Sequence, residues 1–138
     1  MSVEYLESAD GVEAADLGGG FFVGWPHPPS PERHLEMLRG SDHVVLALAD
    51  GRVVGFVTAI SDGVLSAYVP LLEVLPTHQG SGIGSELMRR VLAHLESLYM
   101  VDLCCDDDLE PFYRRLGLLT HDRSMGRRNY EALREVTL

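Results

Sequence analysis

The chain has 138 residues, of which 46% are hydrophobic and 23% are charged, and its formal net charge is −10. These values predict one globular domain over residues 1–138 and exclude a disordered chain. The acidic balance argues against nucleic-acid binding, because phosphate contacts need basic surface. All eleven basic residues are Arg, which excludes chemistry that depends on a lysine, such as Schiff-base catalysis or a P-loop.

The sequence carries no signal for a membrane or a metal. No apolar run approaches the roughly 18 residues of a membrane span, and the first residues lack the pattern of a signal peptide. We therefore expect a soluble, cytoplasmic protein that does not bind a membrane. The two cysteines, Cys104 and Cys105, are adjacent and form no CxxC pair. The six histidines show no ligand spacing, so no metal site is expected.

The N-terminal part is expected to be irregular. Val3–Leu6 predicts a short strand, and residues 10–17 predict a short helix. Gly18–Pro31 is rich in Gly, Pro and aromatic residues, which is typical of a loop. Ser30 before a proline makes a good start for a helix over about 31–39.

A three-stranded meander is predicted next. The strands cover residues 43–48, 52–60 and 64–75, and turn sequences separate them. Sequential strands joined by short turns favour antiparallel pairing. Pro70 lies inside the third strand, and a proline cannot donate to a ladder, so a bulge or an interruption is expected there.

The C-terminal half starts with the strongest helix signal, from Gly84 onward. Met100–Cys105 then predicts a strand, and Asp108 is expected to cap a second helix that Gly117 ends. A final strand is expected after Leu118. The apolar face of the helix predicted from Gly84 onward consists of Leu87, Val91, Leu95 and Leu98.

A glycine-rich segment lies between the third strand and this helix, with glycines at 80, 82 and 84. The free N–H groups and the dipole of a helix start favour an anion, and glycines let a phosphate approach the backbone. The segment therefore predicts a pyrophosphate site; the alternative is a tight structural turn. A Walker A motif is excluded because Ser85-Glu86 stands where Lys-Ser/Thr is needed. A dinucleotide fingerprint fails because Ser85 replaces its last glycine and antiparallel strands precede it.

Two motifs remain, and together they carry a resemblance. Gln79–Gly84 fits the pattern Q/R-x-x-G-x-G/A, and Phe112–Leu118, FYRRLGL, is similar to F-Y-x-x-x-G-F. With the order of elements, they make the chain resemble the GCN5-related N-acetyltransferases. The resemblance implies an α/β (α+β) acyl-CoA N-acyltransferase fold, a mixed and mostly antiparallel sheet flanked by helices. It also implies an enzyme that transfers the acetyl group of acetyl-CoA to a primary amine by direct attack.

The resemblance assigns further roles residue by residue. Tyr113 would protonate the departing thiolate. Asp106 stands where the family often has Asn, and an ionised Asp cannot donate the usual hydrogen bond to pantetheine. The strand before the glycines would run beside the pantetheine and offer backbone to the acetyl carbonyl. The residues implied to bind acetyl-CoA are Leu72, Val74, Gln79, Gly80, Ser81, Gly82, Ile83, Gly84 and Ser85.

Glu73 is the candidate general base. It lies among apolar residues next to the glycine-rich segment, and alternation along a strand puts its side chain opposite Leu72 and Val74. A desolvated carboxylate there should have a raised pKa. The alternative is an exposed or ion-paired glutamate.

The aromatic residues Phe21, Phe22 and Trp25 are candidates for the acceptor site. Aromatic rings in an acidic field suit a cationic amine. The alternative is that they pack onto the core. The acceptor itself is left open among a small amine, an amino acid, an aminoglycoside and a protein amine.

Two other functions are weighed against acetyl transfer. An acyl-CoA-binding sensor without catalysis would bind acetyl-CoA but show no acetyl transfer, so mutation of Glu73 or Tyr113 would change no reaction rate. A nucleotide-binding regulatory domain would prefer ATP or NAD, and the missing lysine counts against it. A homodimer is also left open, since no feature of the sequence decides it.

Overall fold

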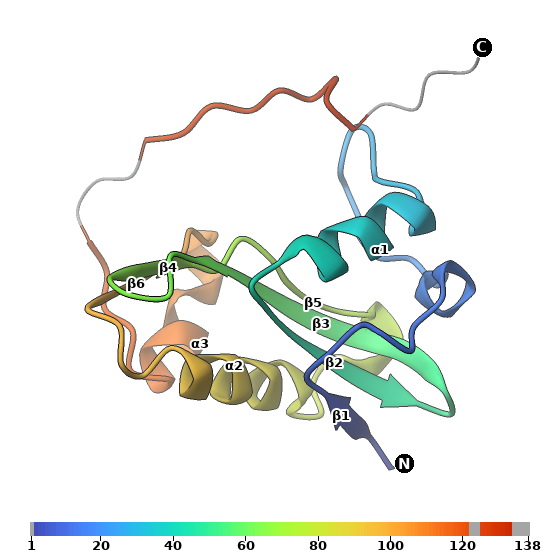
Figure 1. Ribbon diagram of the computed structural model, residues 1–138, viewed down its shortest axis with the longest axis horizontal. Coiled ribbons are helices and arrows are strands. Elements are labelled where there is room, and N and C mark those ends of the chain that lie inside the picture. Colours follow the sequence, from blue (N-terminus) through green and yellow to red (C-terminus); the bar gives the residue numbers. More distant parts are fainter. Residues whose placement is uncertain (1, 122–124, 134–138) are drawn as a thin grey trace.

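The computed structural model describes residues 2–121 and 125–133, and its centre is one six-stranded sheet (Figure 1). The strands pair in the order β1-β2-β3-β4-β6, and β5 pairs with β3 beside β4. All pairs are antiparallel except β4 with β6, which is parallel. The strands are β1 (Glu4–Leu6), β2 (His43–Ala49), β3 (Arg52–Ser61), β4 (Ser66–Tyr68), β5 (Leu72–Val74) and β6 (Met100–Asp102).

Helices cover both faces of the sheet (Figure 1). One face packs on α2, through a core that includes Val57, Ala59 and Leu87, and the segment around α3 joins this core. The other face packs on α1 and η1, through a core that includes Leu38 and Phe56. The helices are η1 (Ala14–Leu17), α1 (Pro31–Gly40), η2 (Pro76–His78), α2 (Ile83–His94), η3 (Asp107–Leu109) and α3 (Glu110–Arg115), of which η1, η2 and η3 are 3₁₀ turns.

The predicted start of α1 and the predicted turn between β2 and β3 are confirmed. Ser30 Oγ accepts a hydrogen bond from the Arg33 N–H at 3.2 Å and caps α1, with a proline at the first helical position. Asp50 and Gly51 join β2 to β3 with φ of 51° and 76°, the left-handed backbone of a tight hairpin turn.

Pro70 interrupts the third predicted strand, as expected, and divides it into β4 and β5. The Val69 N–H donates to the Asp102 carbonyl at 2.9 Å, so the chain up to this point stays with β6. Directly after it, the Leu71 carbonyl accepts from the Thr58 N–H at 3.1 Å, so the chain turns to β3 alone. Among the described residues β5 pairs only with β3, and the sheet is therefore split between β5 and β6.

Several boundaries differ from the predictions. Only Ala14–Leu17 of the predicted helix over 10–17 forms, as a 3₁₀ turn. The strand β6 ends at Asp102, before the cysteines. Asp108 lies inside η3 and does not cap α3, because α3 starts at Glu110 and its N-cap is Leu109. The predicted final strand is absent from residues 118–121 and 125–133, and the rest of that segment lies outside the described residues.

Within the described ranges, no helix combines the length and the apolar character that spanning a bilayer requires.

Candidate active site

The start of α2 leaves backbone N–H groups open. Its N-cap, Gly82, has the left-handed φ of 88°, and no side chain caps the helix. Gly80 is also left-handed, with φ of 80°, so both positions favour glycine. The Glu86 N–H donates to the Gly82 carbonyl at 3.1 Å and begins the helical ladder. The preceding N–H groups of the first turn are therefore available to an anion.

Two side chains of this loop hold its own backbone. The Gln79 side-chain amide donates to the Val74 carbonyl at 3.0 Å, which ties the loop to the end of β5. Ser81 Oγ donates to the His78 carbonyl at 2.9 Å. Gln79 and Ser81 are predicted to belong to the phosphate site, and these contacts show that both residues also fix the loop.

The strand β5 presents backbone groups on its open edge. The Leu75 N–H donates to the Val54 carbonyl at 2.8 Å, and the Leu71 carbonyl is also bonded to β3. Backbone groups of alternate residues in an antiparallel strand point to opposite sides. Those of Leu72 and Val74 therefore point away from β3, into the split between β5 and β6. This is the geometry expected for residues that bind an extended ligand through their backbone.

The two sequence motifs meet at Gly84. A methyl group placed on Gly84 would lie 3.6 Å from Phe112 Cζ and 3.8 Å from Val74 Cγ2. The glycine-rich loop, β5 and α3 thus converge at one place, although 28 residues of sequence separate Gly84 from Phe112.

Tyr113 lies next to Phe112 on α3 and is half-buried against the core. Their rings pack edge to face with centroids 4.9 Å apart. Burial, with a smaller contribution from Cys105, raises the pKa of the Tyr113 phenol to about 12. The hydroxyl is therefore protonated at neutral pH and is able to donate a proton.

Glu73 lies on the opposite face of the sheet from Leu72 and Val74, as alternation predicts. It is paired with Phe56, whose ring belongs to the core under α1, whereas Leu72 and Val74 pack on the core under α2. Glu73 Oε1 accepts a hydrogen bond from the Phe22 backbone N–H at 2.8 Å. Burial raises the pKa of the Glu73 carboxyl, and the bond from Phe22 opposes that shift. The pKa of Glu73 is thus raised, in the direction that the sequence predicts.

The aromatic segment packs around a buried histidine that the sequence analysis did not single out. Phe22 is 4% exposed and His34 is 1% exposed, and their ring centroids are 4.9 Å apart. Phe21 contacts both His34 and Phe56. Trp25 is 39% exposed at the rim of this cluster. His34 belongs to no sequence motif. A single histidine in an amphipathic helix does not indicate whether its side chain is buried or exposed.

Gly55 on β3 permits the close approach of α2. A methyl group there would lie 3.1 Å from the Glu73 carbonyl oxygen, 3.1 Å from Leu87 Cδ1 and 3.3 Å from Ile83 Cγ2. These distances are shorter than ordinary van der Waals contacts, so glycine at this position lets the start of α2 pack closely on β3.

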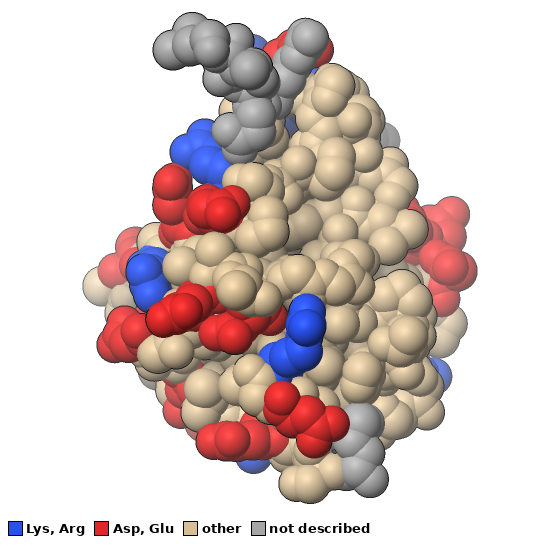
Figure 2. All heavy atoms as spheres, turned by 90° about the vertical axis from the view of Figure 1, so that its right-hand side faces the viewer, with Lys and Arg blue, Asp and Glu red and all other residues tan. Residues whose placement is uncertain are grey.

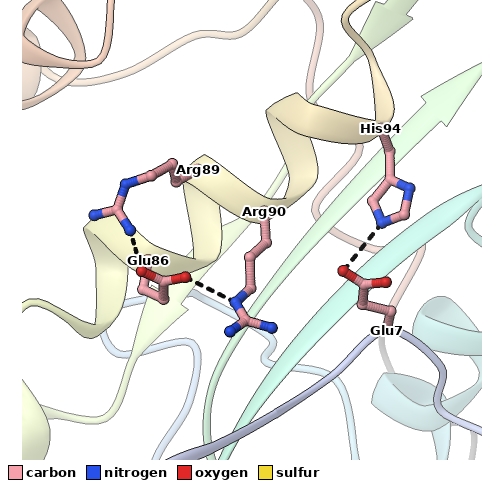
Figure 3. Close-up of polar contacts among 5 residues, drawn as sticks. All are labelled: Glu7, Glu86, Arg89, Arg90 and His94. Atoms are coloured by element: carbon pink, nitrogen blue, oxygen red, sulfur yellow. Dashed lines mark hydrogen bonds and ion pairs between the residues drawn. The ribbon is translucent and has the colours of Figure 1, made fainter.

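The basic side chains on α2 are held along the helix (Figure 3). Arg89 and Arg90 both pair with Glu86, and the Arg90 bond is 2.8 Å long. The Arg90 guanidinium also lies 4.6 Å from the centre of the Tyr5 ring. At the end of the helix, His94 Nε2 is 3.3 Å from Glu7 Oε1. These contacts orient the polar face of α2 toward β1.

Cys104 and Cys105 follow β6 and are exposed. Among the described residues, no three His, Cys, Asp or Glu side chains are grouped as a metal site requires.

Comparison with known proteins relates this geometry to one family. The sequence profile of the Acetyltransferase (GNAT) family matches residues 14–118. A crystal structure of a protein from Deinococcus radiodurans, assigned as an acetyltransferase, is 49% identical, with a TM-score of 0.89 over 99% of this chain and 94% of that one. The comparison confirms the predicted α+β fold.

Two curated plant proteins are also similar. The GCN5-related N-acetyltransferase 3, chloroplastic, of Arabidopsis thaliana is 37% identical over 54% of this chain and 32% of its own length. The Serotonin N-acetyltransferase 2, chloroplastic, of Oryza sativa is 33% identical over 80% of this chain and 58% of its own length. The chain thus covers less than two thirds of either relative.

Proposed function

Because the chain belongs to the GNAT family of acetyltransferases, we propose that it transfers the acetyl group of acetyl-CoA to a primary amine by direct attack through a tetrahedral intermediate. One observation supports this proposal above all. The open start of α2, the free edge of β5 and the helix of Tyr113 converge at Gly84, and Glu73 lies on the other face of β5.

The residues fit acetyl-CoA as a co-substrate. The N–H groups at the start of α2 suit its pyrophosphate, in the loop from Gln79 to Gly84 with Ser85 beside it. The free backbone of Leu72 suits the amides of the pantetheine arm. The outward N–H of Val74 suits the acetyl carbonyl oxygen, on which negative charge develops during attack.

The proposed reaction uses two protein groups for protons. Glu73 takes a proton from the acceptor ammonium, directly or through a water molecule, so that the neutral amine can attack. The new C–N bond forms first and gives the tetrahedral intermediate. The thioester C–S bond breaks when this intermediate collapses, and Tyr113 gives its proton to the departing sulfur. The raised pKa of Glu73 increases its affinity for a proton, and the raised pKa of Tyr113 keeps its phenol protonated before the step.

A cationic acceptor agrees with the surface charge. Residues 1–88 carry 12 acidic side chains and 3 Arg, a balance of −9. Acidic side chains gather on the lower part of the face shown in Figure 2. Such a field raises the local concentration of an amine cation. The rice relative is named for the N-acetylation of serotonin, and we extend only the amine class to this chain. Phe21, Phe22 and Trp25 stay candidates for contact with it.

Acetyl-CoA binding is the first test. Calorimetric titration with acetyl-CoA, with ATP and NAD as controls, should show saturable binding of acetyl-CoA alone. Gly82→Ala should weaken it, because the left-handed φ at the start of α2 disfavours a side chain. Gly51→Ala is the matched control, with a φ of 76° in the β2–β3 turn and equally open surroundings. Binding of a control nucleotide in place of acetyl-CoA would contradict the proposal.

An assay of free-thiol release with a panel of amines then separates the enzyme from a sensor. Thiol release that depends on an amine supports acetyl transfer. Tight binding of acetyl-CoA without any release supports the alternative of an acyl-CoA sensor. A cytoplasmic location and a homodimer stay predictions, and both plant relatives carry "chloroplastic" in their names.

A further inference from the structure

The buried histidine of α1, His34, is connected to the candidate base by two routes. One route runs through the sheet: Glu73 lies opposite Phe56 across the β3–β5 pair, and the centroids of the His34 and Phe56 rings are 4.5 Å apart. The other route runs through the loop before α1. The Phe22 ring lies 4.9 Å from His34, and the Phe22 backbone N–H donates to Glu73 Oε1 at 2.8 Å. His34 therefore packs against two residues that adjoin Glu73.

The backbone at Phe22 needs support from outside its own segment. Its φ of 63° lies in the left-handed region, which a bulky aromatic residue rarely adopts. Gly20 and Gly24 on either side have φ of 99° and 85°, and glycine restricts the backbone least of all residues. The Phe22 ring is 4% exposed, so the packing of this ring keeps its N–H directed at Glu73.

His34 is the rigid partner in this packing. Trp25 also lies 5.0 Å from the Phe22 ring, but it belongs to the same loop and is 39% exposed. His34 is 1% exposed, and its backbone N–H donates to the Ser30 carbonyl at 2.8 Å in the capped first turn of α1. The His34 and Phe22 rings meet edge to face at 74°, a preferred geometry for two aromatic rings. A helix residue thus determines where the loop residue lies.

Stability alone does not explain a histidine at this position. Its Nε2 is buried without a hydrogen-bond partner, and no other buried side-chain nitrogen or oxygen of the described residues lacks one. Such an atom destabilises the folded state, and a leucine of similar volume would avoid that cost. Leucine has no flat ring, whereas the His34 ring packs edge to face on both Phe21 and Phe22. The histidine therefore suits the placement of these rings better than it suits stability.

We propose that His34 is a positioning residue for acetyl transfer, which holds the Glu73 carboxylate in place through the ring and the backbone N–H of Phe22. Because His34 is buried, it acts without contact with either substrate. A base must lie within hydrogen-bond reach of the proton that it takes, so a small displacement of Glu73 lowers the rate. This inference rests on the proposed acetyl transfer and adds a residue to the same site.

The test measures kcat, the dissociation constant of acetyl-CoA and the free energy of unfolding in urea for variants of His34 at neutral pH. The assay is thiol release with the amine of the panel that reacts fastest. His34→Leu should lower kcat about tenfold. Its affinity for acetyl-CoA and its stability should change little, because leucine removes the flat ring and the unpaired Nε2 together. His34→Phe keeps a flat ring and should retain kcat within about threefold.

Leu38→Val is the matched control for a change in this core. Leu38 lies one turn further along α1, is also 1% exposed, and has no ring to place Phe22. The smaller side chain leaves a cavity, so this variant should lose stability and keep its kcat.

A double-mutant cycle tests the route through Glu73. If His34 acts by placing this carboxylate, His34→Leu should not lower the slower rate of Glu73→Gln any further, so the two losses do not add. If His34→Leu fails to fold, Phe22→Leu removes the same ring contact from the loop side and enters the same cycle.

The outcomes separate the inference from the function on which it rests. A His34→Leu variant with the wild-type kcat, or with the same relative loss in the Glu73→Gln protein, would overturn the inference and leave acetyl transfer standing. A loss of kcat that occurs equally in Leu38→Val would also overturn it. Absence of thiol release with every amine, together with no binding of acetyl-CoA, would overturn the proposed function and the inference with it. A loss that His34→Phe restores and that disappears in Glu73→Gln supports the inference.

Discussion

The Phe22 backbone N–H donates a hydrogen bond to Glu73 Oε1 at 2.8 Å and connects the loop before α1 to the candidate base on β5. Phe22 has the left-handed φ of 63°, which is uncommon for an aromatic residue, and its ring is buried beside His34. The bond therefore fixes the base and the aromatic loop relative to each other. It uses one oxygen of Glu73 and leaves the other for an acceptor.

Glu73→Gln should lower kcat about a hundredfold or more, because the amide cannot take a proton. Gln keeps an oxygen for the Phe22 N–H, so the fold should be retained. In the wild type, the base works only when ionised, and burial raises its pKa above the ordinary 4.5. The rate should therefore fall as the pH is lowered through that raised value, and the pH–rate profile of kcat/KM checks this. A Gln variant with the wild-type rate would exclude Glu73 as the base.

Glu73→Ala should have an additional structural effect. It leaves the partly buried Phe22 N–H without its acceptor, which costs about 1–3 kcal/mol. We expect a lower free energy of unfolding in urea than for Glu73→Gln, and a higher KM for the amine because the loop is no longer held. Equal stability of the two variants would show that the bond to Phe22 contributes little.

Tyr113→Phe should reduce kcat about a hundredfold or more, since the thiolate then leaves without a proton from the protein. The ring stays in the core, so the melting temperature should change little. The wild-type phenol has a pKa of about 12 and is protonated over the whole working range. The alkaline side of the pH–rate profile should therefore be the same in both proteins. A new alkaline limb below pH 10 in the wild type that the Phe variant lacks would contradict this assignment.

Local sequence rules predicted the parts of the site that depend on the backbone of one segment. Pro70 lacks an N–H, so it had to interrupt the ladder and create the split beside β5. Alternation along β5 placed Glu73 opposite Leu72 and Val74. The glycines at 80 and 82, which predicted a close approach of phosphate to the backbone, also permit the left-handed turn before α2. In each case, the cause lies within a few residues of the effect.

Contacts between distant segments were not predictable in the same way. The bond from Phe22 to Glu73 joins residues 51 positions apart, and a backbone donor leaves no mark in the sequence. The burial of His34 depends on which side of α1 meets the sheet. Gln79 was recognised by its motif, but its bond to the Val74 carbonyl is set by how the loop folds back on β5. Where Asp108 was expected to cap a helix, the 3₁₀ turn of η3 moved the start of α3 past it.

Gly55→Ala should destabilise the protein by about 1–2 kcal/mol, because the added methyl group meets a backbone oxygen and two side chains at 3.1–3.3 Å. The start of α2 should move away from β5, which also weakens the binding of acetyl-CoA. Gly40→Ala is the matched control. Its methyl group would meet no atom within 4 Å, and Gly40 is the last residue of α1. Urea unfolding and calorimetry of both variants check this, and equal losses at the two positions would contradict it.

His34 should make the protein sensitive to acid. Its Nε2 is buried without a hydrogen-bond partner in the described part of the chain, and burial lowers the pKa of its ring to about 4. In the unfolded chain, the pKa is the ordinary 6.5, so the unfolded state binds the proton first as the pH falls. The folded state therefore loses stability from pH 6.5 down to about pH 4, by up to about 3 kcal/mol. His34→Leu should remove this loss, whereas His121→Gln, a change on the exposed surface, should not. The measurement is the free energy of urea unfolding at pH 7 and at pH 4.5 for the three proteins. A pH dependence that is the same in His34→Leu as in the wild type would show that other groups cause it.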